Sequence, residues 1–409
     1  MTVVKALPDS FTKNAVMISI TALTLVPMGI LRHGFRPFFL GAALWAPLAL
    51  ALWLGMLAGV VNPPLAFDAL AWHQHELLFG YVGGVLAGFL LTAIPNWTGR
   101  PPVSGLPLLG LVLLWAAARS LNLLGGVTGT WLPAAADVGF CAVLVALALR
   151  EIIAGRSWRN LPVVVLLACW GVGCALSQAG TLGAGTGEVG RRLGFGAVFV
   201  LIGLIGGRVV PSFTRNWLSQ RGTSILPAAM GHLDHAAMAA LVVAILSWIA
   251  APASGLTGGL LVVAGFGLLA RLARWCGAST LAQPLVLILH LGYGWLRAGL
   301  ALLGAAILWP AAVGMPVAMH ALTAGAIGTM TLAIMTRATL GHTGRDLSAD
   351  GTTVWIYGLV QAGALLRVLA PALPRHYALA LDLAAFLWAA AFVLFALHYG
   401  PMLVRAHRA

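Results

Sequence analysis

The chain has 409 residues, of which 61% are hydrophobic and only 8% are charged, and its mean hydropathy is +0.97. This composition excludes a soluble globular domain and predicts a polytopic helical membrane protein. The net charge of +13 comes from arginines placed in loops, so it does not indicate nucleic-acid binding. The four cysteines show no CxxC spacing and are interpreted as small core residues rather than disulfides or a zinc site.

Apolar segments of about 20 residues each predict twelve transmembrane helices. An earlier apolar segment, residues 15–31, contains Pro27 and lacks a small-residue cleavage pattern, so an interfacial helix is favoured over a signal peptide. Whether that segment enters the membrane stays open. The predicted helices cover residues 37–61, 74–95, 104–124, 131–150, 161–181, 191–211, 231–251, 256–273, 282–308, 314–337, 352–371 and 377–400.

The basic residues are distributed very unevenly over the loops between these helices. One set of alternate loops holds only Arg191, Arg192 and Arg375, and three further arginines lie within helices; all remaining lysines and arginines fall in the other set. Lysine and arginine mark cytoplasmic loops. The pattern therefore predicts that both termini are cytoplasmic.

One pattern occurs twice in the chain. His75 precedes Thr98-Gly99-Arg100 by the same spacing at which His320 precedes Thr343-Gly344-Arg345, with glycines at matching offsets. A third, degenerate copy is offset by 116 residues from the first, from Phe79-Gly80 to Phe195-Gly196, and places Arg191 at the position of His75. The predicted fold is an all-α integral membrane protein of three four-helix arcs related by an axis along the membrane normal. The predicted parts are a cytoplasmic or interfacial segment, residues 1–36, and the repeats 37–150, 151–275 (degenerate) and 276–409.

Histidines near the outer ends of two repeated helices are the main candidates for ligands. His75 and His320 are predicted at the same depth and would serve as axial ligands of one haem bridging helices two and ten. His73 lies about 200° around the helix from His75, so it would serve a second haem or a metal. Capping at the interface is the alternative for these histidines. The glycines that follow them leave room either for close helix packing or for a flat macrocycle.

Several arginines and two further histidines complete the candidate site. Arg119 and Arg367 are interpreted as ion-pair partners of Asp137 and Asp382, and also, with Arg191 and Arg192, as holders of haem propionates. His290, seven residues before Arg297, is a candidate metal ligand or proton relay, with a satisfied core histidine as the alternative. His342 is a weaker metal candidate, because most histidines at the cytoplasmic side are expected to be solvated.

Five motifs are spread over the chain: Gly34-Phe35-Arg36-Pro37-Phe38-Phe39, Trp72-His73-Gln74-His75-Glu76, Ala93-Ile94-Pro95-Asn96-Trp97-Thr98-Gly99, Gly207-Arg208-Val209-Val210-Pro211-Ser212-Phe213-Thr214 and Met335-Thr336-Arg337 through Gly341-His342-Thr343-Gly344-Arg345. Together they resemble the motifs of the NnrS family, and the resemblance covers nearly the whole chain after residue 30. It implies a haem- and copper-containing protein of the bacterial inner membrane, linked to nitric oxide metabolism and nitrosative stress. The twelve-helix architecture also resembles the main subunit of haem-copper oxidases and nitric oxide reductases, although the copper-ligating histidines of helices six and seven are missing.

The favoured function is that of a membrane redox protein of nitric oxide metabolism with one or two b-type haems, copper as a further cofactor, and membrane lipid, nitric oxide and quinol as partners. An oxidoreductase such as a quinol-linked nitric oxide reductase is one form of this hypothesis, and the sequence leaves open whether the protein is an enzyme. The alternatives are a haem protein that binds nitric oxide without turnover, and a transporter for copper or a small solute.

Overall fold

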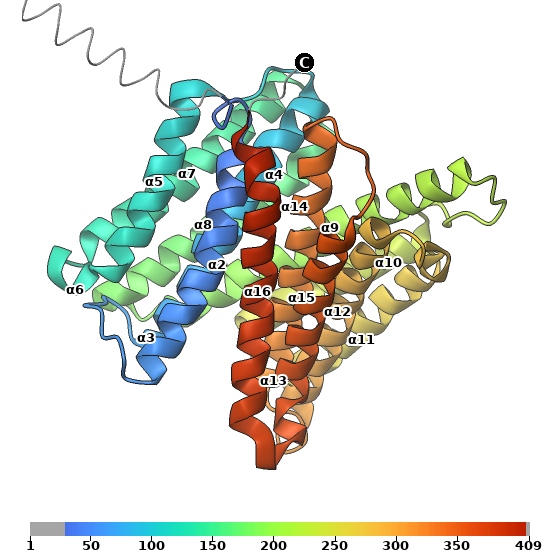
Figure 1. The fold of residues 1–409 in the computed structure, drawn as a ribbon. Coiled ribbons are helices and arrows are strands. Elements are labelled where there is room, and N and C mark those ends of the chain that lie inside the picture. Colours follow the sequence, from blue (N-terminus) through green and yellow to red (C-terminus); the bar gives the residue numbers. More distant parts are fainter. Residues whose placement is uncertain (1–28, 406–409) are drawn as a thin grey trace, which may run out of the picture.

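The computed structural model describes residues 29–405, and within that range the chain is helical without strands (Figure 1). Twelve helices are long and apolar enough to cross a membrane, as predicted. The prediction for residues 15–31 falls almost entirely outside the described range. The twelve spans are α2 (Phe35–Leu57); α3, η1 and α4 (Ala69–Thr98); α5 (Gly105–Leu123); α7 (Trp131–Ala154); η2, α8 and η3 (Trp158–Ala184); α9 (Gly187–Gln220); α10 (His232–Ala250); α11 (Gly255–Ala273); α12 (Pro284–Leu308); α13, η5 and α14 (Met315–His342); α15 and η6 (Gly351–Ala372); and η7 and α16 (Pro374–Val404).

The second, sixth and tenth spans form the core of the bundle. In their most apolar windows 78%, 67% and 61% of the residues are buried, whereas no other span exceeds 56%. These are the three spans that carry the copies of the repeated pattern, with Arg191 in place of the histidine on the sixth span. Side chains on them are therefore the best shielded from lipid, and the other spans surround them.

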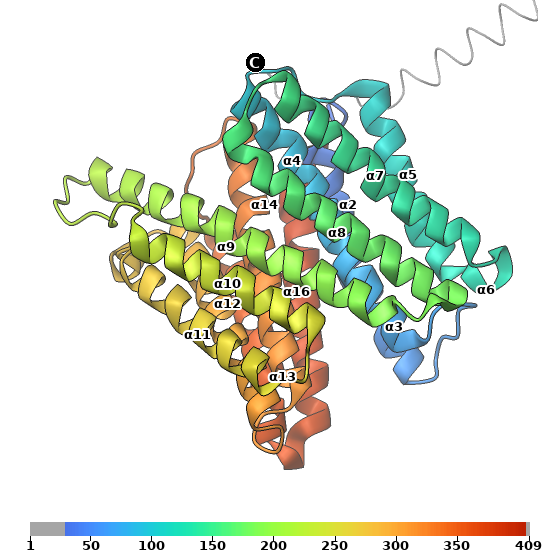
Figure 2. The ribbon, with the colours of Figure 1, turned by 180° about the vertical axis from the view of Figure 1, so that it is seen from behind.

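The sixth span is longer than predicted. It was expected to end at residue 211, yet α9 continues through Pro211 to Gln220 and has 34 residues. At 1.5 Å per residue this is about 51 Å, well beyond the hydrocarbon thickness of about 30 Å. Figures 1 and 2 show its last turns projecting past the ends of the neighbouring helices.

Glycines on the core helices accommodate indole rings. A Cβ atom on Gly83 would lie 3.0 Å from the ring of Trp170, and one on Gly325 would lie 2.6 Å from the ring of Trp295. The room that these glycines leave is therefore occupied by tryptophan from neighbouring spans. At these two positions neither a helix backbone nor a macrocycle fills it.

The first and last spans lie side by side and are joined through one arginine (Figure 1). Arg36 is buried, and its guanidinium donates to the carbonyl oxygens of Leu403 at 2.9 Å and Arg405 at 2.7 Å. The last carbonyls of a helix have no partner within that helix. Arg36 therefore caps α16 and connects the two ends of the described chain.

Candidate functional site

A π-helical segment follows the histidine in both copies of the repeated pattern. Helix α3 (Ala69–His75) ends at His75 and continues as η1 (Glu76–Tyr81), while α13 (Met315–His320) ends at His320 and continues as η5 (Ala321–Ile327). Such segments are frequent at functional sites. Each extra residue in a turn rotates the preceding part of the helix by about 100° relative to the following part.

The imidazole of His75 is fully buried and has polar neighbours at both ring nitrogens. Its Nε2 lies 2.8 Å from Asp137 Oδ2, and its Nδ1 lies 3.4 Å from Ser177 Oγ. The rings of Phe67 and Phe79 flank it, each with its centroid 4.9 Å away. The hydrogen-bonding groups that surround His75 thus come from α7 and α8.

His75 belongs to a buried cluster of charges. Arg119 is 2% exposed and pairs with Glu76 at 2.7 Å and with Asp137, so the predicted pairing of Arg119 with Asp137 is confirmed. Two carboxylates face one guanidinium, so the cluster has one net negative charge when both carboxylates are ionised and His75 is neutral. A proton or a bound cation at His75 balances it, which favours either one in a medium of low dielectric constant.

Side-chain amides complete the hydrogen bonding of the two carboxylates. Asn122 donates to Glu76 Oε1 at 2.9 Å and to Asp137 Oδ2 at 2.7 Å, and Gln178 donates to Asp137 Oδ2 at 2.6 Å. Trp45 Nε1 donates to Glu76 Oε2 at 3.0 Å. Sequence reasoning missed these amides. Their signal is that Asn122 and Gln178 are uncharged polar residues in apolar helices, where an amide needs a partner.

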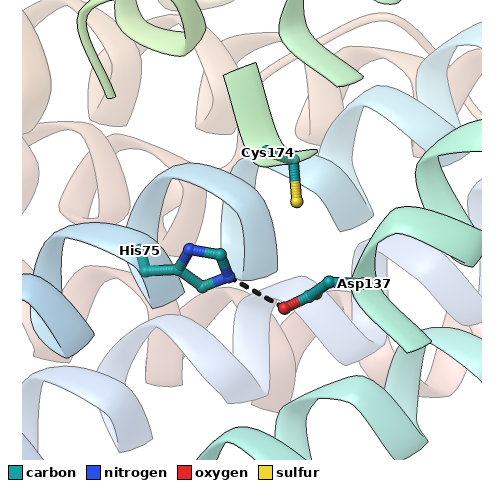
Figure 3. A group of neighbouring side chains, drawn as sticks. All are labelled: His75, Asp137 and Cys174. Carbon is teal, nitrogen blue, oxygen red and sulfur yellow. Dashed lines mark hydrogen bonds and ion pairs between the residues drawn. The ribbon is translucent and has the colours of Figure 1, made fainter. Parts of the chain in front are cut away.

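Cys174 brings a sulfur atom to this cluster (Figure 3). One ligand atom each from His75, Asp137 and Cys174 lies within 4.8 Å of the others, and all three residues are buried. Nitrogen, oxygen and sulfur donors together can hold a transition metal ion. Cys174 was predicted to be a core residue, because the four cysteines show no CxxC spacing.

His73 packs against the first span, where its ring stacks on that of Trp53 with the centroids 4.9 Å apart. His320 and Arg367 lie near enough to His73 to act on it electrostatically. Among the described residues, the buried atoms His73 Nδ1 and Arg367 NH1 have no hydrogen-bond partner. Buried polar atoms without a partner are rare and need an explanation.

The tautomer of His320 is fixed by its own helix. Its Nδ1 lies 2.7 Å from the carbonyl oxygen of Pro316, which can only accept, so Nδ1 carries the proton. The lone pair of a neutral His320 is then on Nε2. Histidines that ligate metals are typically held in this way.

The neighbours of His75 therefore belong to its own cluster, whereas His320 acts electrostatically on His73. The π-helical segment η1 explains why His75 does not point in the direction that a regular α-helix would give it. His75 and Val82 are seven residues apart and would share one face of a regular α-helix, but η1 lies between them and rotates His75. The haem shared by His75 and His320 stays a prediction.

The ionic contacts of Arg191 and Arg192 are with Glu188 and not with residues of either histidine group. Arg191 pairs with Glu188, and Arg192 approaches the same carboxylate at 4.0 Å. Glu188 is 70% exposed, which makes these pairs weak. A role in binding propionates stays a prediction for both arginines.

The predicted ion pair between Arg367 and Asp382 is wrong. In the part of the chain that the structure describes, these two residues form no salt bridge, and Asp382 is exposed. Ala380 and Ala384 are buried on α16, and Asp382 lies about 200° around the helix from each of them. Its carboxylate therefore faces away from the bundle.

The other two predicted histidines lie elsewhere. His290 Nε2 lies 2.9 Å from Thr214 Oγ1, while its buried Nδ1 has no partner among residues 29–405. His342 is the last residue of α14, with its ring 5.6 Å from that of Phe35. Neither residue joins the two groups around His75 and His73.

Fold and site together define a polytopic membrane protein with a buried group of side chains that could hold a metal. The chain belongs to the NnrS family, since the profile described as NnrS protein matches residues 29–407. No curated protein matches it. Family membership links this membrane protein to nitric oxide metabolism, in a family known for metal binding.

The buried cluster predicts the effect of removing its only arginine. Arg119→Gln leaves two buried carboxylates without their counter-charge, and we expect the free energy of unfolding to fall by about 3–5 kcal/mol. The measurement is thermal or chemical unfolding of the detergent-purified protein. Arg192→Gln is the control, because its pair with exposed Glu188 contributes about 1 kcal/mol or less. Equal losses in the two variants would contradict the assigned importance of the cluster.

Proposed function

We propose that this chain is a haem-binding redox protein of nitric oxide metabolism in the bacterial inner membrane, with His73 and His320 as the imidazole ligands. The observations that support the proposal are the buried atoms His73 Nδ1 and Arg367 NH1, which have no hydrogen-bond partner among the described residues, and the fixed tautomer of His320. His320 and Arg367 also lie near enough to His73 to act on it electrostatically. His73 is thus assigned as the partner of His320, in place of His75, which was predicted from the sequence. The placement of both termini in the cytoplasm rests on the distribution of lysine and arginine among the loops.

The donors present in this group suit a haem. His320 has its Nε2 lone pair available, and His73 has a buried Nδ1 atom without a partner among the described residues. Arg367 has a buried NH1 atom that likewise lacks a partner there, and a guanidinium is a natural partner of a propionate. A haem with two imidazole ligands supplies one-electron transfer when bound. Here His73 and His320 would hold and orient the group, and Arg367 would balance its charge.

The His75 cluster supports copper as a second cofactor. A thiolate from Cys174 and a neutral imidazole from His75 are ligands that copper accepts, and Asp137 adds an oxygen. The net negative charge of the cluster favours a cation. Both ligands must lose a proton before they bind a metal, so copper and protons compete for this site.

Loss of either proposed axial ligand should remove the haem spectrum. We expect His73→Ala and His320→Ala to lose the low-spin bands in reduced-minus-oxidised visible spectra of the purified protein. His235→Ala is the matched control, because His235 also directs Nδ1 to the carbonyl four residues earlier, at 2.9 Å, but is exposed.

The variant His75→Gln separates the two pairings of ligands. Under our proposal it keeps the haem bands, whereas a haem held by His75 and His320 would be lost. An unchanged spectrum in His320→Ala would contradict both assignments.

Copper content should depend on one particular cysteine. We expect Cys174→Ser to reduce copper bound per protein by 10-fold or more, the order of loss expected on removing a ligand or its direct support, ~10–100-fold. Elemental analysis after dialysis measures it. Cys169→Ser is the control, because Cys169 lies on the same helix α8 outside the three-residue group. Equal copper in both variants would show that the ion binds elsewhere.

A redox function predicts turnover. With a quinol as electron donor and no oxygen, we expect nitric oxide consumption to exceed one equivalent per protein, since reduction regenerates the site. An electrode for nitric oxide measures this. Consumption that stops at one equivalent would indicate a protein that binds nitric oxide without transforming it.

A further inference from the structure

A cavity of about 80 Å³ lies between the three core spans, on the opposite side of the π-helical segments from the histidines. Its lining residues come from α4 (Val82–Thr98), α9, η5 and α14 (Gly328–His342), and Thr331 is the one polar side chain among them. The lining residues are Val82, Val85, Leu86, Phe89, Val198, Leu201, Ile202, Ile205, Gly206, Val209, Ile327, Met330, Thr331 and Ile334.

One set of four lining positions occurs three times, once on each core span. The quartet Val82, Val85, Leu86 and Phe89 recurs 116 residues later and again 245 residues after the first copy, and all three quartets line the cavity. These offsets are the ones that relate Phe79 to Phe195 and His75 to His320. The spacing i, i+3, i+4, i+7 is one face of a helix. Each core span thus presents the equivalent face to one point, which places the cavity on a threefold pseudoaxis.

The cavity offers no free polar group to water. The hydroxyl of Thr331 donates to the carbonyl oxygen of Ile327 at 2.7 Å and is also bonded to the hydroxyl of Tyr81. A buried water needs two to four polar partners, and cavities without them stay dry and take up xenon or small hydrocarbons. The occupant must therefore be apolar.

We infer that this cavity binds a small apolar gas molecule. A water-sized guest needs about 10–15 Å³ by the same measure, so the volume admits a diatomic molecule with room to move. A lipid chain is disfavoured by burial of the lining residues nearest the histidines, since Val82 and Ile327 are each 3% exposed. Identifying the gas as nitric oxide rests on the proposed function.

The position of the cavity suits supply of gas to the histidines. Val82 and Ile327 each follow a histidine, His75 and His320, by seven residues, or about two helical turns of 5.4 Å. A gas dissolved in the bilayer and held on the axis would thus lie about 10 Å below the level of both imidazoles. The cavity acts as a reservoir at that depth.

Xenon tests the cavity independently of haem and nitric oxide. We expect anomalous diffraction from xenon-pressurised crystals of the full chain to show a peak within the ring of three quartets. Val198→Phe should remove the peak by filling the space, and Val198→Ala should raise its occupancy by enlarging it. Val243→Phe on α10 is the control, because Val243 is 51% exposed and faces outward.

The outcomes distinguish the failure of each proposal. Absence of the xenon peak in the parent protein, or density for a detergent or lipid chain in its place, would overturn the inference. A xenon peak that Val198→Phe leaves unchanged would overturn it as well. If xenon binds as expected while the purified protein has no haem, the gas site stands and the proposed function fails.

Discussion

The buried interaction of Arg119 with Glu76 and Asp137 is the constraint on which the histidine-bearing half of this protein depends. Charges in a medium of low dielectric constant are tolerated only when paired and fully hydrogen-bonded. Here one guanidinium serves two carboxylates, and Asn122 and Gln178 saturate the remaining oxygen lone pairs. The cluster fixes α5, α7 and α8 against the second span, so the position of His75 follows from charge pairing.

The π-helical segment η1 determines the direction in which His75 and His73 point. In a regular α-helix, His75 would point along the face that lines the central cavity, because Val82 lies seven residues further on. The segment η1 rotates it into the charged cluster, and the neighbouring His73, on the other side of the helix, lies outside that cluster and stacks on Trp53. One local irregularity thus places the two histidines of the second span in different surroundings. The same irregularity in η5 makes the arrangement a property of the repeat.

Composition and periodicity predicted the twelve spans, and the family was identified from motifs before any fold was known. The pairing of Arg119 with Asp137 also followed from the sequence, since the two residues occupy adjacent helices, but the place of His75 in this cluster did not. Two features could not be predicted. A π-helical turn has no residue signature in Glu76–Tyr81, and Cys174 reaches Asp137 only because α7 and α8 pack together. The predicted pairing of Asp382 with Arg367 failed because Asp382, although it occupies the position equivalent to Asp137 in the repeat, faces away from the bundle on α16.

The core spans divide into a polar half and an apolar half, and this division has a chemical consequence. Above the π-helical segments lie imidazoles, carboxylates and a thiol; below them the three quartets expose hydrocarbon to the axis. Ions and protons find ligands above the quartets and none among them, since the cavity lining offers no free polar group. An apolar gas favours the second half, as it favours the bilayer itself. A protein built in this way can hold a neutral gas from the membrane near the charged cluster of His75 while the apolar lining disfavours water and ions beside it.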